Sequence, residues 1–211
     1  MIKHFSIDDI SSADKDFRRD LINSLTGYKS LHLMGTINKD GMSNLAPFSQ
    51  VFHVGANPPL LGILFRPHTV ERHTLENILE SRFFTLNHVT PDFYKQAHQC
   101  SARWQQSEFE ATGLEEIYLD AFIAPYVKIS PLKIGCILAD KIELSINDTI
   151  LIIGGIQHVY LEETAVNPSG FVNMEKLGTV AVTGLDEYHT ARRLARLSYA
   201  KPGQPVREIK E

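Results

Sequence analysis

The sequence has few cysteines, no excess of basic residues and no long apolar run. Its two cysteines, Cys100 and Cys136, match no metal-ligand spacing and cannot form a disulfide framework, so we expect reduced, buried thiols. The formal net charge of -4 argues against nucleic-acid and anionic-membrane partners. The longest apolar stretch, residues 150–156, is far shorter than the ~20 residues of a membrane-spanning helix. The first residues lack the apolar region of a secretory signal, which predicts a cytoplasmic protein.

Several motifs of catalysis and nucleotide binding are also missing. The sequence contains no G-x-x-x-x-G-K-[ST], no G-x-G-x-x-G after a strand, no H-E-x-x-H and no G-x-S-x-G. Its nine histidines form no His-x-His pair and no pairing with cysteine at the spacing of metal ligands. We therefore expect no metal site.

The apolar pattern predicts short strands interrupted by a few helices. Hydrophobic residues at 43% and charged residues at 22% are typical of a globular chain. Helical periodicity predicts helices at residues 14–25, 72–81, 92–102 and 186–197. Extended or alternating patterns predict strands at residues 31–37, 43–53, 60–65, 83–87, 135–145 and 149–161. Hairpin turns are expected at residues 38–41 and 147–148, and irregular structure over residues 105–132.

This order of elements favours a mainly β fold, an antiparallel barrel with several peripheral α-helices. It does not show the regular strand–helix alternation of a parallel sheet. No repeat or flexible linker divides the chain, so we predict one domain over residues 1–211. Residues 1–27 would form an N-terminal helical extension, and residues 183–211 a C-terminal tail.

Residues 42–77 combine side chains that suit a phosphorylated, flat cofactor. Pro47 lies inside an expected strand, which predicts a strand edge or bulge with free backbone groups. Arg66 follows the next apolar strand, while Thr74 and Asn77 share one face of the helix that follows. A helix N-terminus, an arginine and hydroxyl groups together suit a phosphate. The same residues also fit a strand edge, a solvated arginine and a helix cap that bind nothing.

Five short motifs then occur in one order along the chain. They are Asn44-Leu45-Ala46-Pro47-Phe48-Ser49, Asn57-Pro58-Pro59, Phe65-Arg66, His73-Thr74-Leu75-Glu76-Asn77-Ile78 and Phe84-Thr85-Leu86-Asn87. This order resembles the flavin reductase-like family of FMN-binding split barrels, whose pattern is N-x-A-P-x-S, a Pro-Pro turn, an Arg after a strand, D-T-x-x-N-I and F-x-V-N. Residues 183–188 also resemble the Gly-then-Tyr ending of that family. The resemblance implies an antiparallel, Greek-key-like split β-barrel.

The resemblance assigns seven residues to an FMN site. They are Asn44, Ala46, Pro47, Ser49, Arg66, Thr74 and Asn77. The first four would line the isoalloxazine and the ribityl chain, partly through backbone groups. Arg66 and Thr74, with Ser49 nearby, would hold the phosphate, and Asn77 would brace the phosphate loop. One position departs from the family pattern, because His73 stands where an aspartate usually precedes the threonine.

The resemblance also implies an NAD(P)H-dependent flavin reductase. NADH or NADPH would pass a hydride to flavin N5, and the electrons would then reach free flavin or another small-molecule acceptor. The alternatives are a non-catalytic FMN-binding or electron-transfer module, a haem carrier, and an FMN enzyme that oxidises pyridoxamine phosphate. His189, next to Tyr188, is a candidate for the flavin face on which nicotinamide stacks. A homodimer with FMN near the subunit interface is implied as well, whereas the choice between NADH and NADPH stays open.

Overall fold

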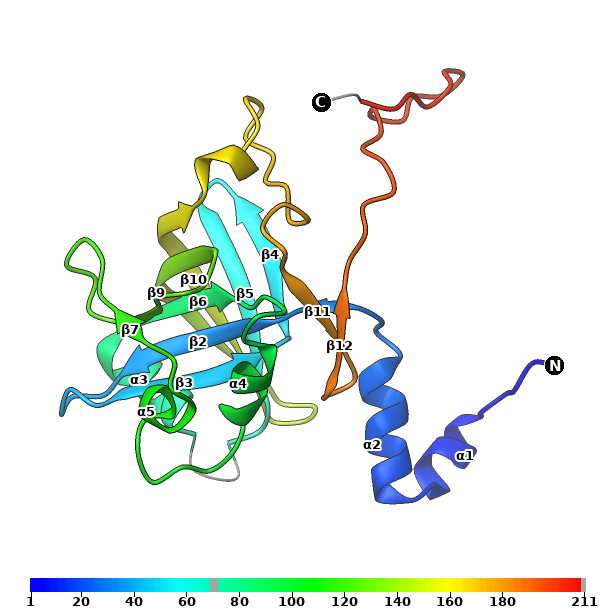
Figure 1. Ribbon diagram of the computed structural model, residues 1–211. Helices are drawn as coiled ribbons and strands as arrows, with labels where there is room; N and C mark the ends of the chain where they lie inside the picture. The colour runs from blue at the N-terminus through cyan, green and yellow to red at the C-terminus, as the bar shows by residue number, and fades with distance from the viewer. Residues whose placement is uncertain (69–71, 210–211) are drawn as a thin grey trace.

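The computed structural model describes residues 1–68 and 72–209, and its main sheet is an antiparallel barrel. Seven strands of this part of the chain are hydrogen-bonded in the order β3-β2-β6-β9-β10-β5-β4. Their bounds are β2 (His32–Ile37), β3 (Ser43–Phe48), β4 (Val51–Ala56), β5 (Pro59–Phe65), β6 (Phe83–His88), β9 (Leu132–Leu144) and β10 (Thr149–Leu161). The two ends of the order, β3 and β4, are consecutive in sequence, so the sheet curls until its edges meet (Figure 1). The predicted mainly β, antiparallel fold is confirmed.

The sheet is split where β3 passes into β4. A single strand over residues 43–53 was wrong, because β3 pairs with β2 whereas β4 pairs with β5. Ser49 and Gln50 connect the two edges, and the backbone N–H of Leu64 donates to the carbonyl of Gln50 at 3.0 Å. Ser49 favours turns only weakly and Gln50 does not favour them, so apart from the nearby Pro47 the local sequence carries little signal of a break there. We call Ser49 and Gln50 the seam of the barrel.

The hairpin of β9 and β10 forms the longest pair of strands. The predicted turn at Asn147 and Asp148 is confirmed, and Asp148 has a φ of 57°, a left-handed conformation that aspartate tolerates well. β9 pairs on its other side with β6, and β10 pairs with β5. This hairpin therefore joins the two halves of the barrel away from the seam.

The barrel has apolar layers on both sides of β2. Leu33 and Met34 are both fully buried, and successive side chains of a strand point to opposite faces. Met34 packs in the barrel core with Ile63 and Phe84, whereas Leu33 packs in a second cluster that contains Phe93. The barrel wall thus carries a covered outer face as well as a filled interior.

Three of the five described helices, α3, α4 and α5, pack against strands of the barrel. The helices of the described residues are α1 (Ile7–Ser12), α2 (Lys15–Ser24), α3 (His73–Ser81), α4 (Tyr94–Gln99) and α5 (Glu108–Thr112), with a 3-10 turn at Glu163–Ala165. The helices predicted at residues 14–25, 72–81 and 92–102 are confirmed as α2, α3 and α4. The stretch expected to be irregular holds α5 and two short strands, β7 (Glu116–Ile117) and β8 (Tyr126–Val127). These elements are too short to produce a clear periodic pattern.

A second, three-stranded sheet stands beside the barrel. Its order is β1-β11-β12, from Lys29–Ser30, Val180–Thr183 and Glu187–Thr190. The helix predicted at residues 186–197 was wrong, since residues 187–190 pair with β11 and the following segment is extended. Leu194 and Leu197 are exposed, so these two leucines form no buried helical stripe against the described residues.

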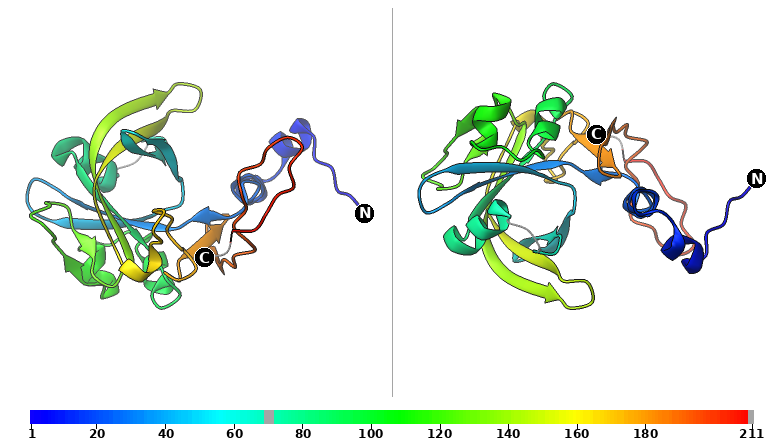
Figure 2. Two further views of the ribbon diagram at one scale, coloured as in Figure 1. Left: turned by 90° about the horizontal axis from the view of Figure 1, so that it is seen from above. Right: turned by 90° about the horizontal axis from the view of Figure 1, so that it is seen from below.

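Both chain ends lie on the same side of the barrel. Views from above and below show α1, α2 and the C-terminal segment on the side that carries the small sheet (Figure 2), and Figure 1 shows that the helices and the C-terminal segment run from it in opposite directions. In the part of the chain that the structure describes, no helix has the length and apolar character needed to span a membrane. Cys100 and Cys136 are buried and unpaired, as expected, and burial raises the pKa of each thiol to about 12.

Candidate functional site: a cleft at the seam of the barrel

A cleft of about 720 Å³ opens at the seam. Its floor consists of residues 46–50, which end β3 and cross the seam, and residues 64–66, which end β5. The remaining walls come from α2, α3, α4 and the small sheet. The size is that of clefts that bind ligands of cofactor size, which typically measure roughly 300–1,000 Å³. The split in the sheet therefore supplies free strand edges and a cavity at the same place.

Basic side chains gather in this cleft. Lys29, Arg66 and Arg72 line it, whereas Asp186 is the acidic residue of the lining. Arg66 is exposed and makes no hydrogen bond or ion pair with the described residues. Burial lowers the pKa of Lys29, and the charge of Arg66 lowers it further. Two cations that repel each other across a cavity form a site that an anion would stabilise.

The neighbouring contacts fix two of these basic groups in place. The ammonium group of Lys29 donates to the backbone carbonyls of Asn23, at 3.2 Å, and of Gly184, at 3.0 Å. Lys29 therefore ties α2 to the turn between β11 and β12. Arg72 precedes the first turn of α3 and donates through Nε to the carbonyl of Pro67 at 3.1 Å. The positive end of the α3 dipole lies at the same end of this helix.

The structure brings five of the seven predicted site residues to the cleft. Ala46, Pro47, Ser49, Arg66 and Thr74 all line it. Their positions in the sequence span three separate elements, and the seam brings them together.

Asn44 and Asn77 are placed differently. Both are buried behind Thr74 and line a second cavity of about 470 Å³, which also borders His73. Asn44 lies in β3, two residues before Ala46, and Asn77 lies in α3 one turn after Thr74. Neither amide belongs to the lining of the cleft: that of Asn44 contacts Thr74, and that of Asn77 contacts Thr36.

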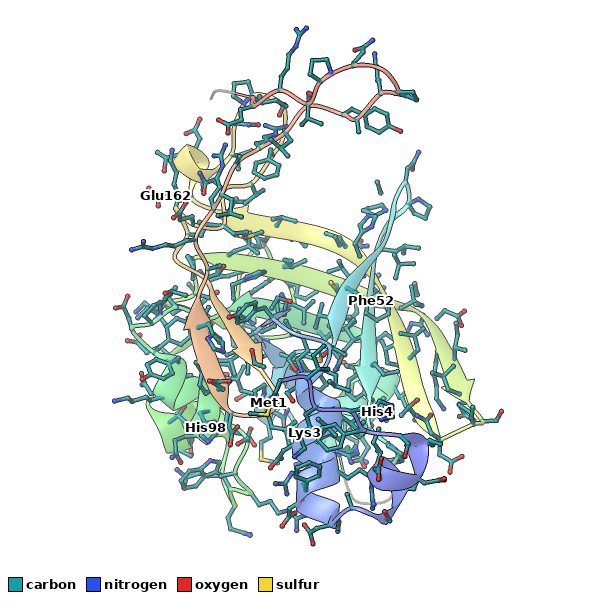
Figure 3. The ribbon with its side chains drawn as sticks, turned by 90° about the vertical axis from the view of Figure 1, so that its right-hand side faces the viewer. Met1, Lys3, His4, Phe52, His98 and Glu162 are labelled. Atoms are coloured by element: carbon teal, nitrogen blue, oxygen red, sulfur yellow. The ribbon has the colours of Figure 1, made fainter. Side chains whose placement is uncertain are left out.

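The small sheet and α4 form the opposite wall. Nδ1 of His98 lies 2.7 Å from the hydroxyl of Tyr188, and both side chains line the cleft. Figure 3 labels His98, which lies on α4 beside the strands β11 and β12. This hydrogen bond joins residues 90 positions apart and attaches the C-terminal sheet to the helix.

His189 lies outside the cleft. Adjacent residues of β12 point to opposite faces, so Tyr188 contributes to the lining and His189 does not. The ring of His189 packs edge-on against Tyr28, with 4.8 Å between ring centroids. Its Nε2 is buried without a hydrogen bond, and the nearest carboxylate oxygen, on Glu187, is 3.6 Å away.

Sequence reasoning did not select Lys29, His98 or Tyr188 as lining residues. Four strands of the barrel, β2 to β5, lie between Lys29 and Arg66 in the sequence, and the place of Lys29 depends on the pairing of β1 with β11. His98 reaches the cleft because Ala97 and Phe93 bury the other face of α4. Such long-range pairings leave no local signal, although Tyr188 lies in the Gly-then-Tyr segment that the family resemblance marks.

The barrel, its seam and this cleft define a split-barrel architecture with a ligand-sized cleft at the split, and comparison with known proteins agrees. Residues 29–178 match the flavin reductase like domain, and the chain belongs to this family. A split-barrel protein from Shewanella frigidimarina NCIMB 400, itself proposed to be a flavin reductase, is 47% identical and superposes with a TM-score of 0.91, over 94% of this chain and 100% of that chain. The predicted split barrel is thereby confirmed.

More distant proteins share the same fold. An uncharacterized protein of Aquifex aeolicus (strain VF5) is 26% identical over 83% of this chain and 90% of its own length. The 2-nitrobenzoate 2-nitroreductase NbaA of Pseudomonas fluorescens is 24% identical and superposes with a TM-score of 0.81, over 96% of this chain and 98% of that chain. At this identity the second likeness concerns the fold alone. Membership of the flavin reductase family implies a flavin and an activity of the oxidoreductase class.

Proposed function

We propose that the protein binds FMN in the cleft at the seam and catalyses its reduction by NADH or NADPH. The observation that carries this proposal is the exposed Arg66, which has no partner among the described residues and shares the cleft with Lys29 and Arg72. A phosphate monoester is an anion that accepts several hydrogen bonds, and it suits such a basic cluster at a helix N-terminus. The chain's net charge is -4, so attraction of an anion would depend on these few residues.

The remaining lining suits a flat heteroaromatic ring. Ala46, Pro47 and Phe48 offer small or apolar surface, and Pro47 has no backbone N–H to leave unpaired. When bound, a flavin accepts a hydride and can pass electrons on, so the reaction requires no nucleophile from the protein. The role of this chain is therefore to bind the flavin, orient it beside the nicotinamide and exclude water.

We further propose that the described residues form part of a single domain that works as a homodimer. Residues 1–27 and 183–211 would be its extension and tail, of which residues 210–211 lie outside the described part. Several large apolar side chains of these ends are more than half exposed: Ile2, Ile7, Leu25, Leu194, Leu197 and Tyr199. A second copy of the chain would cover them, and the cleft, which borders Asn23 and Asp186, would then lie near the interface.

The visible absorption spectrum of the purified protein tests the proposed function. The protein is mixed with excess FMN, passed through a desalting column under anaerobic conditions and titrated with NADH or with NADPH. Retained flavin absorbance that NADH or NADPH bleaches would support the reductase and would show which nucleotide is used. Retained flavin that neither nucleotide bleaches would favour a binding or electron-transfer module. A protein that retains no FMN and shows no saturable affinity for it would contradict both.

A further inference from the structure

A buried polar network lies directly behind the cleft. It consists of Thr36 in β2, Asn44 in β3, and Thr74 and Asn77 in α3, all of them at most 9% exposed. Nδ2 of Asn44 donates to Oγ1 of Thr74 at 3.0 Å and lies 3.3 Å from Oγ1 of Thr36. Nδ2 of Asn77 donates to Oγ1 of Thr36 at 3.1 Å. Thr74 is the member of this network that lines the cleft.

The direction of the Asn44–Thr74 hydrogen bond determines where the Thr74 proton points. A hydroxyl group has one proton to donate and can accept through its lone pairs. Because Asn44 presents its amino group to Oγ1 of Thr74, the hydroxyl proton cannot be directed at Asn44. Thr74 therefore keeps a donor for a group in the cleft, beside Arg66 and Arg72.

The network also restricts the amide of Asn44. A free asparagine side chain can rotate and exchange its oxygen and nitrogen, whereas this one is buried between two threonine hydroxyls. Asn77 supports the arrangement from the same helix as Thr74, through its bond to Thr36. A buried donor that lost these acceptors would be left without a hydrogen bond at a cost in free energy, which favours one orientation of the amide.

We propose that Asn44 is a positioning residue, which holds Thr74 as a hydrogen-bond donor to an anionic phosphate group in the cleft and does not itself contact the ligand. This inference rests on the proposed function, because it concerns the phosphate end of the FMN site. The role it gives Asn44 differs from the contact with the flavin ring that the family resemblance implies.

Comparing the binding of FMN and riboflavin distinguishes a role of Asn44 at the phosphate from a contact with the flavin ring, because riboflavin has the same ring and ribityl chain but no phosphate. We would measure the affinity of the wild type and of Asn44→Leu, Thr74→Val and the double variant for both ligands, by quenching of flavin fluorescence. Asn44→Leu should weaken FMN binding about tenfold, as expected for one hydrogen bond to a charged group, and leave riboflavin binding unchanged. In the Thr74→Val background, Asn44→Leu should cause no further loss, because its effect passes through the hydroxyl.

Asn44→Asp is the variant that tests the direction of the hydrogen bond. A carboxylate accepts the Thr74 proton and turns the donor away from the cleft, so FMN binding should fall further than in Asn44→Leu. Thr74→Ser, which keeps the hydroxyl, should retain most of the affinity and serves as the matched control. Thermal unfolding of each variant establishes that it is folded, and Asn44→Asp, which is close to isosteric, is available where Asn44→Leu does not fold.

The outcomes also distinguish this inference from the proposed function. Equal losses of FMN and riboflavin affinity in the Asn44 variants would overturn the inference and indicate a direct contact with the ring. Additive losses in the double variant, or unchanged FMN binding in Asn44→Asp, would overturn it as well while leaving FMN binding by the wild type intact. Failure of the wild type to bind FMN would overturn the proposed function and this inference together.

Discussion

The imidazole rings of His32 and His88 contact each other inside the protein, with 3.1 Å between their Nε2 atoms. His32 lies at the start of β2 and His88 at the end of β6, directly opposite each other in the register of these strands. Both residues are less than 10% exposed. A hydrogen bond between two such nitrogens requires that one ring donates and the other accepts, so the pair is stable only when at least one ring is neutral.

We expect this pair to make the fold sensitive to acid. Burial lowers the pKa of His88 to about 4, and burial together with His88 lowers the pKa of His32 well below its usual range. In the unfolded chain both would titrate near 6.5, so the unfolded state binds more protons between these values. The free energy of unfolding should therefore be highest above pH 6.5 and should fall as the pH drops from about 6.5 to about 4, by about 3 kcal/mol for His88 alone.

Urea unfolding of the wild type and of His88→Phe at pH 8 and pH 5 measures this effect. The variant should lose less stability than the wild type between the two pH values, whatever its stability at pH 8. His53→Phe is a matched control, since His53 is exposed and its replacement should leave the pH dependence unchanged. An equal decline in the wild type and His88→Phe would show that other groups cause the acid sensitivity.

A second prediction concerns Gly35, where β2 passes beneath the loop that holds Pro125. A Cβ atom at this position would overlap the carbonyl oxygen of Pro125 and approach Oγ1 of Thr85 to 2.7 Å. These two groups are joined by a hydrogen bond of 2.6 Å, so neither can move away freely. Gly35→Ala should destabilise the protein by about 3 kcal/mol, as expected for overpacking against a fixed backbone.

Gly155→Ala is the control for this prediction. Gly155 also lies in a strand of the barrel, but a Cβ atom there would meet nothing closer than Cγ2 of Ile137, at 3.7 Å. Its stability in urea should remain within about 1 kcal/mol of the wild type. Similar losses in both variants would mean that Gly35 is sensitive because it lies in a strand and not because of Pro125.

The turn at Asn147 and the seam at Ser49 and Gln50 show which parts of this fold could be predicted from the sequence and which could not. Local patterns predicted most strands, three helices and the turn at Asn147, because apolar periodicity and turn residues act within a few positions. The seam at Ser49 and Gln50 and the pairing of Lys29 with Val182 depend on strands that meet only in the folded chain. The same limit applies to the site.

For the site, the sequence identified residues but not all of their positions. Pro47, Arg66 and Thr74 lie in short motifs and line the cleft together. Asn44 belongs to the same motif as Pro47, yet its side chain lies on the other side of Thr74. A motif identifies which residue stands at a position. The face on which the side chain of that residue lies depends on how the sheet and α3 pack in the folded chain.

A third prediction compares the neighbours Tyr188 and His189. Tyr188 lines the cleft and binds His98, so Tyr188→Ala should remove part of its wall and weaken flavin binding about tenfold or more. His189 lies on the other face of β12 against Tyr28, so His189→Ala should leave the kcat and KM of NADH or NADPH oxidation within about twofold of the wild type. Steady-state kinetics and flavin titration of both variants would check this. A much slower His189→Ala enzyme would instead assign His189 a role in the reaction.

The last prediction concerns the unpaired charge of Arg66. An arginine can bind a phosphate through two parallel N–H groups, and Arg66 forms no ion pair with a carboxylate of the described residues, although Asp186 also lines the cleft. Arg66→Met removes this charge and keeps much of the side-chain volume, so FMN binding should weaken by about 1.5–3 kcal/mol, as for one or more hydrogen bonds to a charged group. Arg66→Lys should recover part of that loss, because lysine keeps the charge without the planar fork.

Riboflavin is the control ligand, and its affinity for both variants should match the wild type. Isothermal titration with FMN at low and high salt would measure the loss of affinity and its electrostatic part: the variant should show a weaker dependence of affinity on salt, and an unchanged salt dependence together with unchanged FMN affinity would remove Arg66 from the phosphate site.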